Sequence, residues 1–204
     1  MDHYKSLIEN FGTLGPKMYN SINYITNNYS DAPPIQNIVP KQLEFFDAEN
    51  TIFIEQLTND YKQNTLVEFI ISSIKTIHQK EDPSEQSIWS TDANRSNYII
   101  KELLENKNSY WTIDKKGIKS GEYLVKPILD FIKKEIIKYN NNAYEMIRDT
   151  SNVRKEIIME TQKCSSELLT DIEDGKLCTD IIKKLSHHFF HKQSKNNLSI
   201  EDVD

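Results

Sequence analysis

The sequence predicts a mainly α fold, a helical bundle with a long C-terminal helix, and three observations lead to this prediction. Glycine and proline are scarce, with five and six residues among 204, which argues against a many-turned β-sandwich. Apolar residues recur at the three- and four-residue spacing of amphipathic helices in 66–77, 124–136 and 177–185. From Met146 to Leu168 the spacing approximates a heptad in a polar context, which indicates a long exposed helix or a coiled-coil arm.

The first half of the chain is expected to alternate between helices and loops. The apolar spacing within 17–28 predicts an amphipathic helix, and the paired prolines of 31–34 force an extended loop after it. Pro40 suits the first position of another helix. Residues 52–57 fit either a helix or a strand, whereas 66–77 predicts a core helix that stops before the next Asp-Pro pair.

The middle of the chain predicts a further helix and then a β-prone segment. The 90–92 segment supplies N-cap candidates for a helix over 94–105. Residues 109–113 favour a strand, and the turn that follows them either returns a short strand or leads into a loop. A small β-hairpin near 109–118 is therefore compatible with the sequence.

These elements divide the chain into four expected parts. The body is a helical domain over 17–140, preceded by an N-terminal extension over 1–16. A C-terminal helical or coiled-coil arm follows over 141–191. The polar segment 192–204 is expected to be a disordered tail.

Composition limits the classes of protein that this chain can belong to. With 37% hydrophobic and 27% charged residues, the chain is apolar enough to fold. No stretch approaches the roughly 20 apolar residues that span a bilayer, and the first residues lack the pattern of a secretory signal. The two cysteines, Cys164 and Cys178, are too sparse for a disulfide framework. We therefore expect an intracellular protein without a membrane partner.

Charge is unevenly distributed along the chain. The net charge of −6 disfavours non-specific attraction to nucleic acid, yet 107–138 holds eight lysines against four acidic residues. Lysines that meet phosphates and aromatic rings that stack on bases predict RNA or DNA binding there. The candidate side chains are Lys115, Lys116, Lys119, Tyr110 and Trp111. The alternative is a solvated lysine face with Trp111 as a core anchor.

Three stretches carry a resemblance to a known family: 19–35, 82–104 and 111–132. They contain an Ala-Pro-Pro loop, a Gln-Ser-x-Trp-x-x-Asp segment, an Arg before Tyr-Ile-Ile, and Trp-x-x-Asp-Lys-x-Gly before a proline-containing helix. In this order they resemble the C-terminal domain of poorly characterised proteins of giant DNA viruses of amoebae, over residues 17 to 140.

The resemblance implies a setting rather than an activity, namely the host cytoplasm or the viral factory of a giant virus. Many members of that family carry an N-terminal zinc-finger-like element and a coiled coil. This chain has no Cys-x-x-Cys or paired Cys/His spacing, so no metal ligands are carried over from the family.

The segment from Tyr98 to Leu104 has the Tyr-x-x-x-x-Leu-apolar pattern by which scaffold proteins bind the cap-binding translation initiation factor. On the predicted helix, Tyr98, Leu103 and Leu104 share one broad side and can enter an apolar groove of a partner. A poorer match lies at 61–67. The alternative is that these side chains simply pack in the core.

The sequence predicts neither catalysis nor a cofactor. His187, His188 and His191 invite a metal site, but zinc would need further ligands, and histidines near a helix C-terminus also interact favourably with the helix dipole. Asp92 is expected to cap a helix and Asp114 to lie in a turn, rather than to act as paired catalytic carboxylates.

We therefore expect a non-enzymatic helical adaptor of a giant virus that acts in viral gene expression, with a cap-binding initiation factor as candidate partner. Two other classes remain open. One is a nucleic-acid-associated protein that uses the basic segment, and the other is a structural component of the virion or viral factory.

Overall fold

The computed structural model describes residues 16–43, 51–103, 108–148 and 150–191. The longer helices are α2 (Pro16–Asn28), α3 (Thr51–Lys62), α4 (Leu66–His78), α6 (Lys126–Arg148), α7 (Asn152–Glu173) and α8 (Lys176–His188). The strands are β1 (Ile88–Asp92), β2 (Asn97–Leu103) and β3 (Ser109–Asp114). Short helical segments are η1 (Pro40–Leu43), η2 (Pro83–Glu85), η3 (Ala93–Arg95), η4 (Lys115–Gly117), α5 (Ile118–Ser120) and the π-helical η5 (Gly121–Val125). The predicted mainly α fold with a small antiparallel β element is confirmed.

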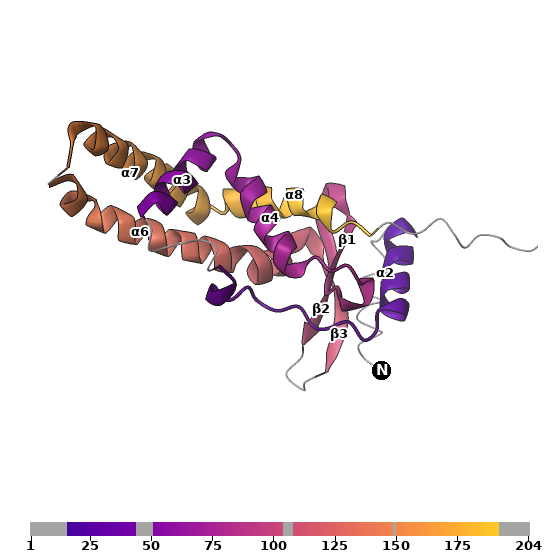
Figure 1. Cartoon of the computed structure of the whole chain (residues 1–204). Helices are drawn as coiled ribbons and strands as arrows, with labels where there is room; N and C mark the ends of the chain where they lie inside the picture. Colours follow the sequence, from indigo (N-terminus) through magenta and orange to yellow (C-terminus); the bar gives the residue numbers. More distant parts are fainter. Residues whose placement is uncertain (1–15, 44–50, 104–107, 149, 192–204) are drawn as a thin grey trace, which may run out of the picture.

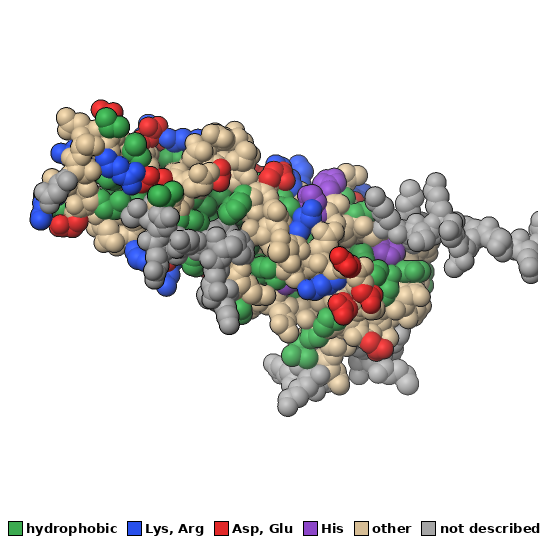
Figure 2. Space-filling view, viewed as in Figure 1, with side chains coloured by type: hydrophobic (Ala, Val, Ile, Leu, Met, Phe, Trp, Pro, Cys, Tyr) green, Lys and Arg blue, Asp and Glu red, His purple; other side chains and the backbone are tan. Residues whose placement is uncertain are grey.

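The body is elongated, with helices at one end and the sheet at the other (Figure 1). At the helical end, α6 and α7 form an antiparallel pair with α3 packed against them. α4 and α8 lie side by side in the middle, and α8 also contacts β1. Figure 2 shows basic and acidic side chains interspersed over the α6–α7 end of this face. Within the described ranges, no helix has the length and apolar character to cross a membrane.

The sheet is antiparallel in the order β1-β2-β3, and its residues contribute to two separate apolar clusters. Because side chains alternate along a strand, Tyr98 and Ile100 face the main core while Ile99 faces a second, smaller one. That second core packs the sheet against α2 through Ile25, Ile99 and Trp111. The central strand is thus buried on both sides.

The helix predicted over 94–105 is wrong, because residues 97–103 form β2. A strand that is buried on both faces has a continuous run of apolar residues. Because a short run of this kind has no periodicity, the sequence does not distinguish it from a buried helix. Asp92 does cap a helical segment, but only the single turn η3, by accepting hydrogen bonds from the backbone N–H groups of Asn94 and Arg95.

The boundary expected at 140/141 lies inside α6, so 141–191 is not a separate arm. Leu168 of α7 and Ile181 of α8 belong to the same core as the sheet residue Tyr98. In α7 the expected heptad is only partly matched by burial, since Cys164 and Leu168 are buried whereas Val153 and Ile157 are exposed. The expected 1–16 extension, except for Pro16, and the 192–204 tail lie outside the described residues.

The residues that follow α8 form backbone hydrogen bonds with strand β1. The backbone N–H of Ser90 donates to the carbonyl oxygen of Phe189 over 2.8 Å, and that of His191 donates to the Ser90 oxygen over 3.0 Å. The His191 ring is buried, with centroids 5.3 Å from Trp89 and 5.1 Å from Tyr24. These contacts hold the end of the described chain against both β1 and α2.

Candidate functional site

A groove of about 710 Å³ lies between the start of α6 and the start of α8, and we call it the α6–α8 groove. Its walls come from η3, η4, α5, η5, α6, the end of α7 and α8. Segments about 90 residues apart in sequence, such as Arg95 and Lys183, therefore line one concave surface.

A glycine at 117 allows the η4 segment to approach α8 closely. Gly117 has φ +67°, and a Cβ on it would lie 2.5 Å from Ile182 Cγ2 and 2.9 Å from Tyr98 Cε2. At Gly121 a Cβ would make ordinary van der Waals contacts, 3.5 Å from Cys178 Sγ and 3.9 Å from Ile182 Cγ1. Only glycine fits at 117, because both the left-handed backbone and the close contact disfavour any side chain.

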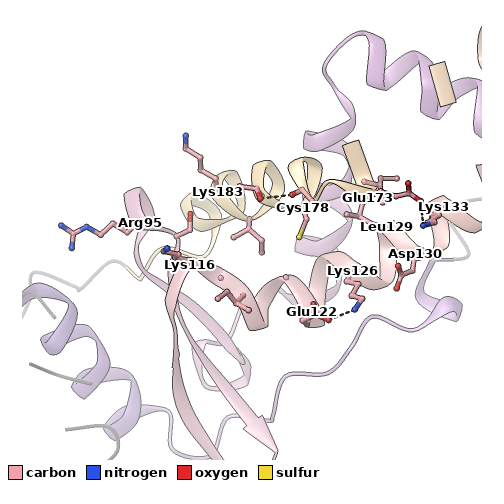
Figure 3. A pocket seen from close by; sticks show the side chains of 18 of the residues that line it. Arg95, Lys116, Glu122, Lys126, Leu129, Asp130, Lys133, Glu173, Cys178 and Lys183 are labelled. Atoms are coloured by element: carbon pink, nitrogen blue, oxygen red, sulfur yellow. Dashed lines mark hydrogen bonds and ion pairs between the residues drawn. The ribbon is translucent and has the colours of Figure 1, made fainter. Parts of the chain in front are cut away.

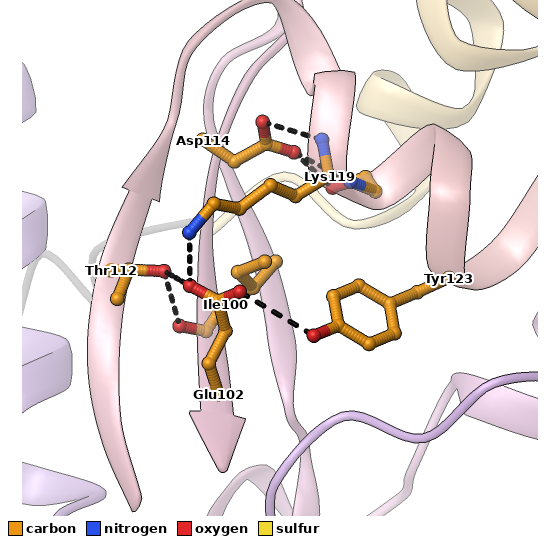
Figure 4. Close-up of polar contacts among 7 residues, drawn as sticks. Ile100, Glu102, Thr112, Asp114, Lys119 and Tyr123 are labelled. Atoms are coloured by element: carbon orange, nitrogen blue, oxygen red, sulfur yellow. Dashed lines mark hydrogen bonds and ion pairs between the residues drawn. The ribbon is translucent and has the colours of Figure 1, made fainter. Parts of the chain in front are cut away.

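A buried carboxylate fixes the same segment to the sheet (Figure 4). Asp114, at the end of β3, accepts hydrogen bonds from the backbone N–H of Lys119 at 3.0 Å and from that of Ser120 at 2.7 Å. The Ser120 hydroxyl donates to it as well, also over 2.7 Å. Asp114 thus supplies acceptors at the start of the helical run that forms one wall of the groove.

A second carboxylate, Glu102 of β2, joins the sheet to the same wall (Figure 4). It accepts hydrogen bonds from Thr112 Oγ1 and Lys119 Nζ, and the Tyr123 hydroxyl lies 3.5 Å away. Burial raises the pKa of Tyr123, and the charge of Glu102 adds to this. Lys119 is consequently paired with Glu102, and it does not line the groove.

The floor of the groove is apolar. Ile118, which is 68% exposed, lines the groove together with the buried side chains of Leu129 and Ile182. The thiol of Cys178 points from α8 toward η5 (Figure 3). Burial raises the pKa of this thiol, with a contribution from Glu122, so it is neutral at physiological pH. A large exposed isoleucine beside such a floor is a surface that gains from being covered.

The rim of the groove carries five cationic side chains and three carboxylates. Lys126 pairs with Glu122 at 3.0 Å, Lys133 pairs with Glu173 at 2.6 Å, and Arg95 lies 3.7 Å from Asp92. Among the residues that the structure describes, the ammonium groups of Lys116 and Lys183 form no ion pair. The groove therefore keeps unneutralised positive charge, although the whole chain has a net charge of −6.

A second groove, of about 650 Å³, lies on the other side of α8 and shares Lys183 with the first. Its other three lysines are already paired with acidic side chains: Lys62 with Glu160, Lys176 with Asp171 and Lys184 with Glu68. Because its cations are largely neutralised, this groove is the weaker candidate for a binding site.

The structure does not present the residues predicted to bind a partner on one surface. Tyr98 is fully buried, and its hydroxyl donates to the Ile182 carbonyl oxygen over 2.6 Å. Leu103 is 58% exposed but lies five residues further along β2, hence on the opposite face of the strand. Leu104 lies outside the described residues. Tyr98 is therefore a core residue, which was the alternative considered for this motif.

The residues predicted to bind nucleic acid are also separated. Trp111 is 3% exposed, its indole N–H donates to the Tyr29 carbonyl oxygen over 2.9 Å, and the Lys101 ammonium lies 5.6 Å from its ring centroid. It is a core anchor and has no free face for a base. Tyr110 is half-buried, Lys115 is exposed, and Lys116 lines the α6–α8 groove.

The histidines and aspartates that the sequence singled out have structural surroundings. No group of three or more His, Cys, Asp or Glu side chains is placed to hold a metal ion within the part of the chain that is described. His187 and His188 are exposed, whereas His191 is packed among aromatic rings. Asp92 and Asp114 both accept backbone hydrogen bonds.

Acid is expected to destabilise the fold through His78, which is buried and whose Nε2 atom has no hydrogen-bond partner among the described residues. Burial lowers the pKa of His78 from 6.5 to about 4, and the charge of Lys80 adds to this. Stability is full above pH 6.5 and is lost as pH falls toward 4, because only the unfolded chain then takes up the proton. The loss is at most about 3 kcal/mol.

Urea unfolding at several pH values between neutrality and pH 4 measures this effect. The His78→Gln variant is the control, since glutamine cannot take up a proton in this range. Its free energy of unfolding should depend less on pH than that of the original chain. The same slope in both proteins would mean that other groups cause the acid effect.

Sequence reasoning missed most of the groove. Arg95, Ile118 and Lys183 were not candidates, although Lys116 and Lys126 were counted in the basic segment. The only available signal was the local excess of lysine between 107 and 138. The lysine excess was interpreted as a nucleic-acid site because the apolar residues of the groove floor come from three separate parts of the chain. The sequence does not show that they form one surface beside these lysines.

Comparison of the chain with family models, with curated proteins and with solved structures gave no match in any of the three.

Proposed function

We propose that this protein is a non-enzymatic interaction module that binds an acidic segment of a partner protein in the α6–α8 groove. The observation that carries the proposal is an apolar groove lined by the exposed Ile118 side chain and by Lys116 and Lys183, two lysines without an ion pair to any described residue. Apolar anchors framed by charges are typical of surfaces that bind peptide segments.

The two kinds of contact would contribute in different ways. Covering one large aliphatic side chain stabilises a complex by roughly 1.5–3 kcal/mol. Rim charges contribute less affinity, because they remain partly in water, but they select the sign of the partner and speed its approach. An acidic and amphipathic segment satisfies both requirements.

The surroundings of the groove also favour binding over catalysis. Its thiol, Cys178, is kept neutral by burial, and a neutral thiol is a poor nucleophile. Two of its three carboxylates, Glu122 and Glu173, are paired with lysines. These partners leave little scope for acid–base chemistry by the described side chains.

The adaptor role and the giant-virus setting expected from the sequence remain part of this proposal, with the host cytoplasm or viral factory as the location. Capture of a cap-binding initiation factor through Tyr98 is not part of it, since the ring would have to leave the core first. Nucleic acid is the second candidate, because the unneutralised cations of the rim would also attract phosphates.

A labelled amphipathic peptide, with leucines at helical spacing and glutamates elsewhere, tests the proposal by fluorescence anisotropy. It should bind the protein, while a peptide with lysine in place of every glutamate should not. Ile118→Asp should weaken binding about 10- to 30-fold, as loss of an interface anchor does.

Val153→Asp is the matched control, because Val153 is 69% exposed and does not line the groove. It should leave peptide binding unchanged, and both variants should unfold within about 0.5 kcal/mol of the original chain. Equal binding of the acidic and basic peptides, or no effect of Ile118→Asp, would contradict the proposal.

A further inference from the structure

We infer that the segment recognised by the α6–α8 groove is polarised: its carboxylates lie at one end, an apolar side chain covers Ile118, and its other end is neutral or basic. This inference rests on the proposed function and specifies the chemistry of the partner. Its basis is the distribution of charge along the groove, whose two ends differ in sign (Figure 3).

One end of the groove is positive. Arg95 of η3, Lys116 of η4 and Lys183 of α8 lie together there. α8 is held against η3 by the Ser186 hydroxyl, which donates to the Ala93 carbonyl oxygen over 2.8 Å. The only carboxylate paired with these three cations in the described chain is that of Asp92, 3.7 Å from Arg95. This end therefore attracts carboxylates.

The other end is slightly negative. Lys126 and Lys133 are paired there with Glu122 and Glu173, and Asp130 lines the same part of the groove without an ion pair to any described residue. Two cations thus face three carboxylates. The partial positive charge at the N-terminus of α8 also lies at this end, but Glu173 and Asp174 immediately precede it and offset it.

A segment with acidic residues along its whole length would place some of them against Asp130 and Glu173, where like charges repel. The same argument disfavours single-stranded RNA, whose charge is uniform and which binds best to a continuous track of cations. A segment with an acidic end and a neutral or basic end avoids this repulsion. Charge complementarity thus fixes the orientation of the occupant as well as its composition.

Three labelled peptides of equal length and composition test the inference. Each has the same central leucines, with its glutamates grouped near the N-terminus, grouped near the C-terminus, or spread evenly. One of the two grouped peptides should bind about tenfold more tightly than the spread peptide, a difference of the size that removing one repulsive contact gives. Grouped and spread peptides of equal affinity would overturn the inference.

The orientation is read by a nitroxide label at either end of the tighter peptide. The label at its acidic end should broaden the amide NMR signals of Arg95, Lys116 and Lys183, and the label at the other end those of Asp130 and Lys133. Uniform broadening from both labels would contradict a fixed orientation.

Charge-reversal variants test the two ends of the groove separately. Asp130→Lys removes the negative end and should abolish the preference for the grouped peptide. The double variant Lys116→Glu and Lys183→Glu should abolish binding of all three peptides.

The failure of this inference can be told apart from that of the proposed function. If grouped and spread peptides bind equally and Ile118→Asp still weakens both, the groove binds acidic segments without polarity. If no acidic peptide binds, both ideas fail. A single-stranded RNA could also bind the protein. If Ile118→Asp did not affect RNA binding and Lys116→Glu weakened it, the rim would be a nucleic-acid site, and both the proposed function and this inference would be overturned.

Discussion

Replacing Tyr98 with alanine is expected to lower the free energy of unfolding by about 3–5 kcal/mol, the range for removal of a buried aromatic side chain. The ring is fully buried in the main core, and its hydroxyl donates to the Ile182 carbonyl oxygen. Burial, with a contribution from the charge of Asp114, raises the pKa of Tyr98, so the phenol stays protonated and able to donate.

Chemical denaturation of three variants measures this effect and separates its parts. Tyr98→Phe keeps the ring and removes only the hydroxyl's hydrogen bond, because the Ile182 carbonyl still lies within the backbone ladder of α8, and should cost about 0.5–1.5 kcal/mol. Leu103→Ala, at an exposed position on the other face of β2, should stay within about 0.5 kcal/mol of the original chain. If the Tyr98→Ala protein kept normal stability but no longer bound a partner, the hypothesis that the Tyr98 motif binds a partner would be restored.

Replacing Gly117 with alanine is expected to cost about 2–5 kcal/mol, as the sum of two effects. A Cβ in the left-handed region costs about 1–2 kcal/mol, and φ at this glycine is +67°. The new methyl group would also lie 2.5 Å from Ile182 Cγ2 and 2.9 Å from the Tyr98 ring. Relieving such overpacking costs roughly another 1–3 kcal/mol.

Gly175 provides the matched control for this substitution. Its φ is +70°, almost the same as that of Gly117, but a Cβ there would have no atom within 4 Å. Gly175→Ala should therefore show the backbone effect alone, about 1–2 kcal/mol. The urea midpoints of Gly117→Ala and Gly175→Ala measure the difference between their losses of unfolding free energy. Equal losses would mean that η4 moves away from α8 at little cost.

The helices that bury one face were predictable from the sequence. α4, the central part of α6, and α8 each have one apolar stripe, and the predicted stripes correspond to buried residues such as Ile74, Ile132 and Ile181. In these helices most of the residues that recur with the 3.6-residue period are buried, so the local sequence pattern is sufficient to predict the helix and its buried face.

The central strand and the groove were not predictable in the same way. β2 is covered by the main core on one face and by α2 on the other, which removes the alternation that marks a half-buried strand. The groove joins Arg95, Ile118 and Lys183, whose proximity depends on how η3, α5 and α8 pack. Sequence spacing has no information on such long-range contacts, although the lysine excess did include Lys116.

The segment that follows α8 has a consequence for how this protein meets others. Ser90 gives both its backbone N–H and its carbonyl group to Phe189 and His191. An extended peptide from another molecule would find the middle of that strand occupied, so strand addition at this side of the sheet is blocked by the chain itself. Self-protection of this kind limits edge-to-edge aggregation.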